Sequence, residues 1–170
     1  MIPSVIQVRL VAVVPHHTIA DGEYDDLTVG RFSALGFALQ VRSTAATDAR
    51  SGVSQEGGPV PVTTVTGTVV VPSEEAPPIL AAGAVQPLLA SADETWPADA
   101  QLAVTGQLVV EPYLWAADGM LWPLVPDGVR MWSVDGIRRI GLDGIEDLTT
   151  LSGPTDLDHG STYVLELVDV

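Results

Sequence analysis

Histidine and carboxylate side chains gather in the segment PHHTIADGEYDD, and together these residue types bind zinc, iron or manganese. The candidate metal ligands are His16, His17, Glu23 and Asp25. Adjacent histidines on an extended backbone point to opposite faces, however, and neither HxH nor HExxH spacing occurs. The alternative is an acidic surface loop with an Asp-Gly turn and no metal.

A second group of reactive side chains lies near the C-terminus, where His159 stands beside Asp156, Asp158 and Ser161. These are the residue types of a hydrolase triad. Folds assemble such triads from distant segments, so closeness in sequence is weak support, and no GxSxG motif is present. The segment DLDHGST therefore indicates a polar turn before a final strand.

Aromatic residues are few, but the four tryptophans fall close together with one tyrosine in the second half of the chain. Such a cluster can form a platform for a sugar, a peptide or a protein surface. It can equally fill the core of a β domain. A guanidinium near the cluster can stack on an indole. The candidate ligand- or partner-binding residues are Tyr113, Trp115, Trp122, Arg130, Trp132 and Arg138.

The dipeptide Asp-Gly occurs four times at spacings of eight or nine residues, beginning at Asp118, Asp127, Asp135 and Asp143. Asp-Gly favours two-residue hairpin turns, and the apolar segments between the pairs have strand lengths. The row therefore predicts a meander. Calcium loops place their ligands two residues apart, so convergence of these carboxylates on one ion is not expected. The segment after the last pair, IEDLTTL, has helical character, with Asp143 as its N-cap.

The chain carries 22 acidic residues against seven basic ones, a formal net charge of −15. All the basic residues are arginines, and none lies between residues 51 and 129, where nine acidic residues stand. This charge repels nucleic acids and anionic membranes and attracts a basic protein or a cation. The alternative is that the charge serves solubility alone.

The absence of cysteine excludes disulfides, thiolate metal sites and a cysteine nucleophile, and it fits a reducing, cytoplasmic location. The absence of lysine excludes Schiff-base chemistry and a P-loop. The apolar start of the chain lacks a basic region and is interrupted by Arg9, so it predicts a strand and not a signal peptide.

Strands are predicted wherever β-branched residues run or alternate with polar ones. A loop is predicted over residues 43–61 and a proline-rich connection over 73–100. The predicted strands cover residues 4–14, 62–71, 101–111 and 161–170, with a glycine-kinked strand or a short helix in the segment LTVGRFSALGFALQVRS. The sequence VTG recurs at Val65–Gly67 and Val104–Gly106, which indicates bent strands and either two related half-units or a coincidence of composition.

These patterns predict an all-β protein: an antiparallel barrel or sandwich of about ten strands ending in the Asp-Gly meander. It forms one domain over residues 1–170, with 1–72 and 101–170 as alternative sub-units. The expected function is a non-catalytic interaction protein that engages another, basic protein and needs no cofactor. A carbohydrate- or small-ligand-binding module and a metal-dependent hydrolase are the alternatives, and homo-oligomer formation stays open.

Overall fold

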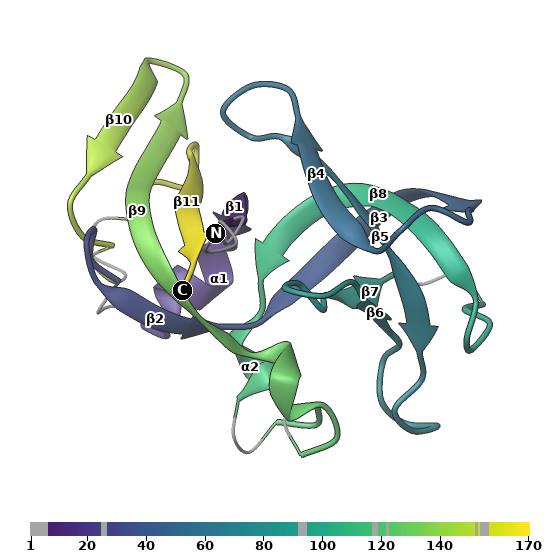
Figure 1. Cartoon of the computed structure of the whole chain (residues 1–170). Coiled ribbons are helices and arrows are strands. Elements are labelled where there is room, and N and C mark those ends of the chain that lie inside the picture. Colours follow the sequence, from purple (N-terminus) through teal and green to yellow (C-terminus); the bar gives the residue numbers. More distant parts are fainter. Residues whose placement is uncertain are drawn as a thin grey trace, which may run out of the picture.

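The computed structural model describes residues 7–24, 27–91, 95–116, 119–121, 123–151, 153 and 157–170. Eleven strands in these ranges join into one continuous sheet, so the all-β prediction is confirmed (Figure 1). The strands are β1 (Arg9–Val14), β2 (Phe32–Leu35), β3 (Phe37–Ala46), β4 (Gly52–Glu56), β5 (Val62–Val70), β6 (Ile79–Ala81), β7 (Leu88–Ala90), β8 (Gln101–Val110), β9 (Arg130–Gly141), β10 (Gly144–Leu148) and β11 (Thr162–Asp169). The short helices are α1 (His16–Ala20), α2 (Pro112–Trp115) and the 3₁₀ turn η1 (Pro126–Gly128).

Five of these strands close into a barrel in the order β5-β8-β3-β7-β6, with β6 pairing back onto β5. The β3–β7 pairing is parallel, and the other four pairings of the ring are antiparallel. Strand β4 extends from β5 outside the ring. The prediction of a barrel is therefore confirmed, but the prediction that it is antiparallel throughout is wrong at the β3–β7 pairing.

The remaining strands form a second group, β10-β9-β11-β1, with β2 paired to β9 (Figure 1). This group joins the barrel where β1 runs parallel to β8 at Val13 and Val109. A single cluster of buried side chains includes Leu10 and Trp132 from this group and Val104 from the barrel. Burial of apolar surface therefore holds the two groups of strands together.

The glycines of the two VTG segments lie where a neighbouring strand approaches closely. A Cβ added to Gly67 would lie 2.3 Å from the Ala81 carbonyl oxygen, and one added to Gly106 would lie 2.1 Å from that of Gln40. Val65 and Val104 are direct cross-strand partners between β5 and β8. Both copies thus belong to one barrel, and an ancestral duplication stays a prediction.

The Asp-Gly meander is wrong at two of the three pairs that the structure describes, while Asp118 lies outside the described residues. Asp127 and Gly128 belong to η1. Asp135 and Gly136 lie inside β9, where Asp135 is the extra residue of a bulge opposite β11. Only the last pair stands at a hairpin, between β9 and β10.

The helix predicted after Asp143 is also wrong, because residues 144–148 form the edge strand β10. Glu146 lies opposite Arg139 on β9, and the two side chains form an ion pair. Cross-strand pairing of this kind favours an extended conformation over the local helical preference of the segment.

The predicted loop over residues 43–61 and the connection over 73–100 contain more strand than expected. Strand β3 continues to Ala46, β4 occupies residues 52–56, and β6 and β7 lie inside the proline-rich connection. The Gln55 side chain on β4 accepts a hydrogen bond from Val11 N (2.7 Å) and donates to Val11 O (2.7 Å) and to the Thr63 hydroxyl (2.9 Å). Gln55 thus links β4 to β1.

Candidate binding site

A cavity of about 280 Å³ opens between the turn after α1, the β2–β3 junction and α2. Carboxylates and aromatic rings both line it. We call it the acidic-aromatic pocket, and its residues are Glu23, Tyr24, Ala34, Gly36, Glu111, Pro112, Trp115, Ala116 and Val129.

The turn after α1 places Glu23 and Tyr24 at one wall of the pocket. Thr18 is fully buried, and its hydroxyl donates to the Pro15 carbonyl (2.7 Å). The Glu23 amide then donates to the Thr18 carbonyl (3.1 Å) and closes the turn. Ile19 anchors this short helix in the core. Hydrogen bonds at both ends of α1 therefore fix the direction in which Glu23 leaves the helix.

Glu111 forms the opposite wall because it caps α2. One carboxylate oxygen accepts hydrogen bonds from Tyr113 N (2.8 Å) and Leu114 N (3.2 Å), as N-cap residues do. Pro112 suits the first helical position. The Glu111 amide donates to the Gly36 carbonyl (3.0 Å), which ties the cap to the end of β2.

The indole of Trp115 closes the inner end of the pocket and is held from both sides. Its Nε1 donates to the Phe37 carbonyl (2.9 Å). An added Cβ at Gly36 would lie 2.3 Å from the ring, and one at Gly128 would lie 2.0 Å from it. Glycine at these two positions therefore makes room for the indole, which explains Gly128 without a hairpin turn.

Replacing Gly128 with alanine is expected to lower the free energy of unfolding by about 2 kcal/mol, because the new methyl group overpacks the seat of Trp115. Urea unfolding followed by tryptophan fluorescence measures this loss. Gly58→Ala is the matched control, since nothing lies within 4 Å of its added Cβ. Equal stability of the two variants would show that Gly128 does not hold the ring in place.

The pocket and its rim are negatively charged. The described ion pairs are Arg9–Asp135, Arg138–Glu166 and Arg139–Glu146, and none of them involves Glu23, Glu111 or the nearby Asp21. Burial raises the pKa of Tyr24, and the charges of Glu111 and Glu23 raise it further. Among the described residues, these carboxylates are therefore not neutralised by an arginine.

Tyr113 stands on the rim, where its hydroxyl donates a hydrogen bond to the Asp21 carboxylate and its ring stacks on the imidazole of His17 at 5.9 Å. The bond to Asp21 raises the pKa of Tyr113 to about 12, with smaller contributions from burial and from the charges of Asp21, Glu23 and Glu111. The protonated phenol is thus the form that the folded rim favours.

Ultraviolet titration is expected to show Tyr113 ionising near pH 12, and Asp21→Asn should bring this pKa down toward the ordinary value of about 10. The raised pKa means that any stabilisation by this bond is complete below pH 10 and lost as the pH rises through the folded-state pKa. Tyr113→Phe identifies the transition. An unchanged pKa in Asp21→Asn would contradict the contact.

An apolar strip lies beside the pocket on the outer face of β2 and β9, formed by Phe32, Ala34 and Met131. Phe32 is 63% exposed and Met131 is 49% exposed. Ala34 pairs with Met131 across the two strands and also lines the pocket. Exposed apolar side chains next to polar groups are typical of interaction surfaces.

The tryptophan platform is not formed by the rings that the structure describes. Trp132 is completely buried, with its ring edge-to-face against Phe37, and Trp115 is only 3% exposed. Trp122 lies outside the described residues. The core alternative therefore holds for both rings: Trp132 is closed off, and Trp115 borders open space only where it lines the acidic-aromatic pocket.

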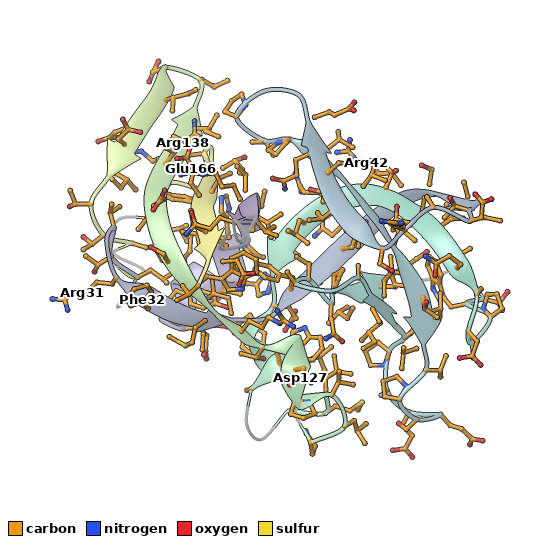
Figure 2. All side chains as sticks on the ribbon, in the orientation of Figure 1. Arg31, Phe32, Arg42, Asp127, Arg138 and Glu166 are labelled. Carbon is orange, nitrogen blue, oxygen red and sulfur yellow. The ribbon has the colours of Figure 1, made fainter. Side chains whose placement is uncertain are left out.

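Neither arginine of the predicted partner site is among the residues that line the pocket. Arg138 forms an ion pair with Glu166 across β9 and β11, and Figure 2 shows the two side chains together. Arg130 lies at the start of β9 and is paired with Leu35 of β2. Of the predicted aromatic residues, Trp115 lines the pocket, and Tyr113, which follows the pocket-lining Pro112, is 38% exposed beside it.

The predicted metal ligands point to different neighbours. His17 stacks on Tyr113, whereas the ring of His16 lies 2.5 Å from the Ser161 carbonyl through Nε2. Glu23 lines the pocket, and Asp25 lies outside the described residues. In the described ranges no group of three or more histidine and acidic side chains is placed to hold a metal. Because Asp25 lies outside these ranges, the metal site stays a prediction.

The fold brings His16 to the C-terminal turn, where its ring lies 5.7 Å from that of His159. Ser161 does not form a nucleophile–base pair there: its hydroxyl donates to Asp158 (2.6 Å), and His16 contacts its backbone oxygen. This bond from Ser161 lowers the pKa of Asp158. The turn before β11 is thus a closed polar network, as the sequence indicates.

Comparison of the chain with protein-family models, with curated proteins and with solved structures finds no match. In the part of the chain that the structure describes, no helix has the length and apolar character needed to cross a membrane. The function must therefore be argued from the pocket and the surface around it.

Proposed function

We propose that this protein is a non-catalytic binding module that engages a basic segment of another protein through the acidic-aromatic pocket. The observation that carries the proposal is the pairing of two carboxylates, Glu23 and Glu111, with the aromatic rings of Tyr24 and Trp115 in one cavity. An arginine or lysine side chain has a charged end for the carboxylates and an apolar stem for the rings.

The charge of the whole chain supports the same partner. A net charge of −15 attracts a basic protein over distances of about a Debye length, roughly 8 Å at physiological salt. Such steering raises the rate of association more than the final affinity. The apolar strip of Phe32, Ala34 and Met131 adds contact area that is not salt-dependent. We place this interaction in the cytoplasm, supported by the absence of cysteine.

Neither alternative function has an observation of comparable weight. A carbohydrate-binding module needs aromatic faces open to a sugar, and Trp115 and Trp132 are buried. A hydrolase built on Ser161 needs a base on its hydroxyl, which bonds to Asp158 instead.

Calorimetric titration with an octapeptide of alternating arginine and threonine tests the proposal. We expect binding that weakens with rising salt, and we expect Glu23→Gln/Glu111→Gln to weaken it about tenfold, which is about 1.4 kcal/mol. Glutamine at position 111 keeps an acceptor for the helix cap. The matched control is Glu74→Gln/Glu75→Gln, which removes the same charge from exposed positions outside the pocket.

If both double variants lose affinity equally, net charge alone attracts the peptide and the pocket is not the site. If the wild-type protein does not bind the peptide even at low salt, the proposal fails altogether. A loss confined to the pocket variant supports it.

A further inference from the structure

Strand β2 has one edge on β9 and no strand among the described residues on its other edge. It is the four-residue segment Phe32–Leu35, which lies along the lower side of the second group of strands and leads into β3 of the barrel (Figure 1). An edge of this kind presents backbone donors and acceptors to which another extended chain can add.

The register with β9 identifies which groups of β2 are free. Val134 N donates to Arg31 O at 2.9 Å, so Arg31 faces β9 with its backbone oxygen. Antiparallel pairs alternate, so the backbone groups of Ser33 and Leu35 also face β9. Those of Phe32 and Ala34 then point away from β9, and the described residues outside β9 make no backbone hydrogen bond to them.

This free edge leads directly to the acidic-aromatic pocket, since Ala34 and, two residues later, Gly36 both line the pocket. The side chains of Phe32 and Ala34 share the exposed face of the strand. Figure 2 shows Arg31 and Phe32 at the outer side of the molecule, with the Arg31 side chain directed into solvent. A chain added along β2 would therefore place side chains beside Phe32 and Ala34 and pass the mouth of the pocket.

We propose that the partner binds as an extended basic segment that adds to β2 as a further strand and places one arginine or lysine side chain in the acidic-aromatic pocket. This inference rests on the proposed function and specifies how the partner is recognised. Backbone hydrogen bonds to Phe32 and Ala34 contribute affinity, and the pocket gives specificity for a basic side chain. Charge complementarity selects the occupant: Glu23 and Glu111 lack an arginine partner among the described residues.

The test uses the arginine–threonine octapeptide and a twin in which every backbone amide is N-methylated. The twin keeps the charges and side chains but has no amide donors. We expect the twin to bind the wild-type protein at least tenfold more weakly. Ala34→Pro should weaken the unmethylated peptide by a similar factor, because proline removes an edge donor that β9 does not use.

Amide hydrogen exchange gives a second readout that does not depend on a variant that folds. Peptide binding should slow the exchange of the Phe32 and Ala34 amides at least tenfold. The Ser33 amide is the internal control, because its bond to β9 is present with or without peptide.

Each alternative outcome is distinct. Equal binding of both peptides, with sensitivity to Glu23→Gln/Glu111→Gln retained, overturns strand addition and leaves the proposed function in place. Failure of both peptides to bind overturns both proposals. A dimer in sedimentation that Ala34→Pro dissociates assigns the β2 edge to a second copy of the chain and overturns the inference.

Discussion

Replacing Trp132 with alanine is expected to lower the free energy of unfolding by about 4 kcal/mol, the range found when a large aromatic side chain is removed from a core. Trp132 is completely buried, and its ring packs edge-to-face on Phe37 at 5.6 Å. It stands on β9 where β2 and β11 both pair with that strand. The cavity left by the indole would therefore loosen the packing beneath three strands.

Urea unfolding followed by circular dichroism measures this loss, and Trp96→Ala is the comparison. Trp96 is partly exposed at the edge of the same core, so its removal should cost clearly less. Trp132→Phe should cost less than Trp132→Ala, because it keeps a ring and removes an indole N–H that has no hydrogen-bond partner among the described residues. A Trp132→Ala loss no larger than that of Trp96→Ala would contradict the core position of Trp132 and revive the ligand platform.

The sequence predicted the elements whose stability depends on their own residues. Runs of β-branched residues predicted β1, β5, β8 and β11, and the glycines of the VTG segments lie where neighbouring strands of the barrel approach closely. Asp135-Gly136 was misinterpreted because Asp-Gly prefers a turn only when no partner strand competes. Strand β11 pairs along the whole of this stretch of β9 and absorbs the dipeptide as a bulge.

The candidate site was predicted only in pieces. Tyr113 and Trp115 were named together as partner-binding residues, whereas Glu23 was named as a metal ligand, in another site with another chemistry. Glu111 and Tyr24 were missed, although Glu111-Pro112 is a helix-start signal that places a carboxylate at a fixed angle. The meeting of these residues depends on the bond from the Glu111 amide to the Gly36 carbonyl, a tertiary contact that local patterns do not encode.

Burial was the other property that the sequence left open. A tryptophan cluster is compatible with a platform or with a core, since the same rings serve both. The deciding features are the glycines opposite the ring, Gly36 and Gly128, which leave space for the Trp115 indole from two distant segments. That these two glycines lie against the Trp115 ring can be seen only from the three-dimensional arrangement of β2, α2 and η1.

Replacing Gln55 with leucine is expected to lower the free energy of unfolding by about 3 kcal/mol, although the two side chains are similar in size. The Gln55 amide satisfies the backbone N–H and C=O of Val11 on β1 and the hydroxyl of the fully buried Thr63 on β5. Leucine leaves the hydroxyl of the buried Thr63 and the half-buried backbone groups of Val11 without that partner, and a lost bond to a buried group costs about 1–3 kcal/mol.

The matched control is Gln40→Leu, an exposed position on β3, which should change the stability by less than about 0.5 kcal/mol. Gln55→Glu separates hydrogen bonding from size, because glutamate keeps the acceptor for Val11 N–H but faces Val11 O without a donor. It should be destabilised at neutral pH and recover part of the loss in acid, where a protonated carboxyl can donate. If Gln55→Leu unfolds at the same urea concentration as Gln40→Leu, the Gln55 bonds to β1 do not contribute to stability. The parallel contact of β1 with β8 and the shared core would then be what joins the second group of strands to the barrel.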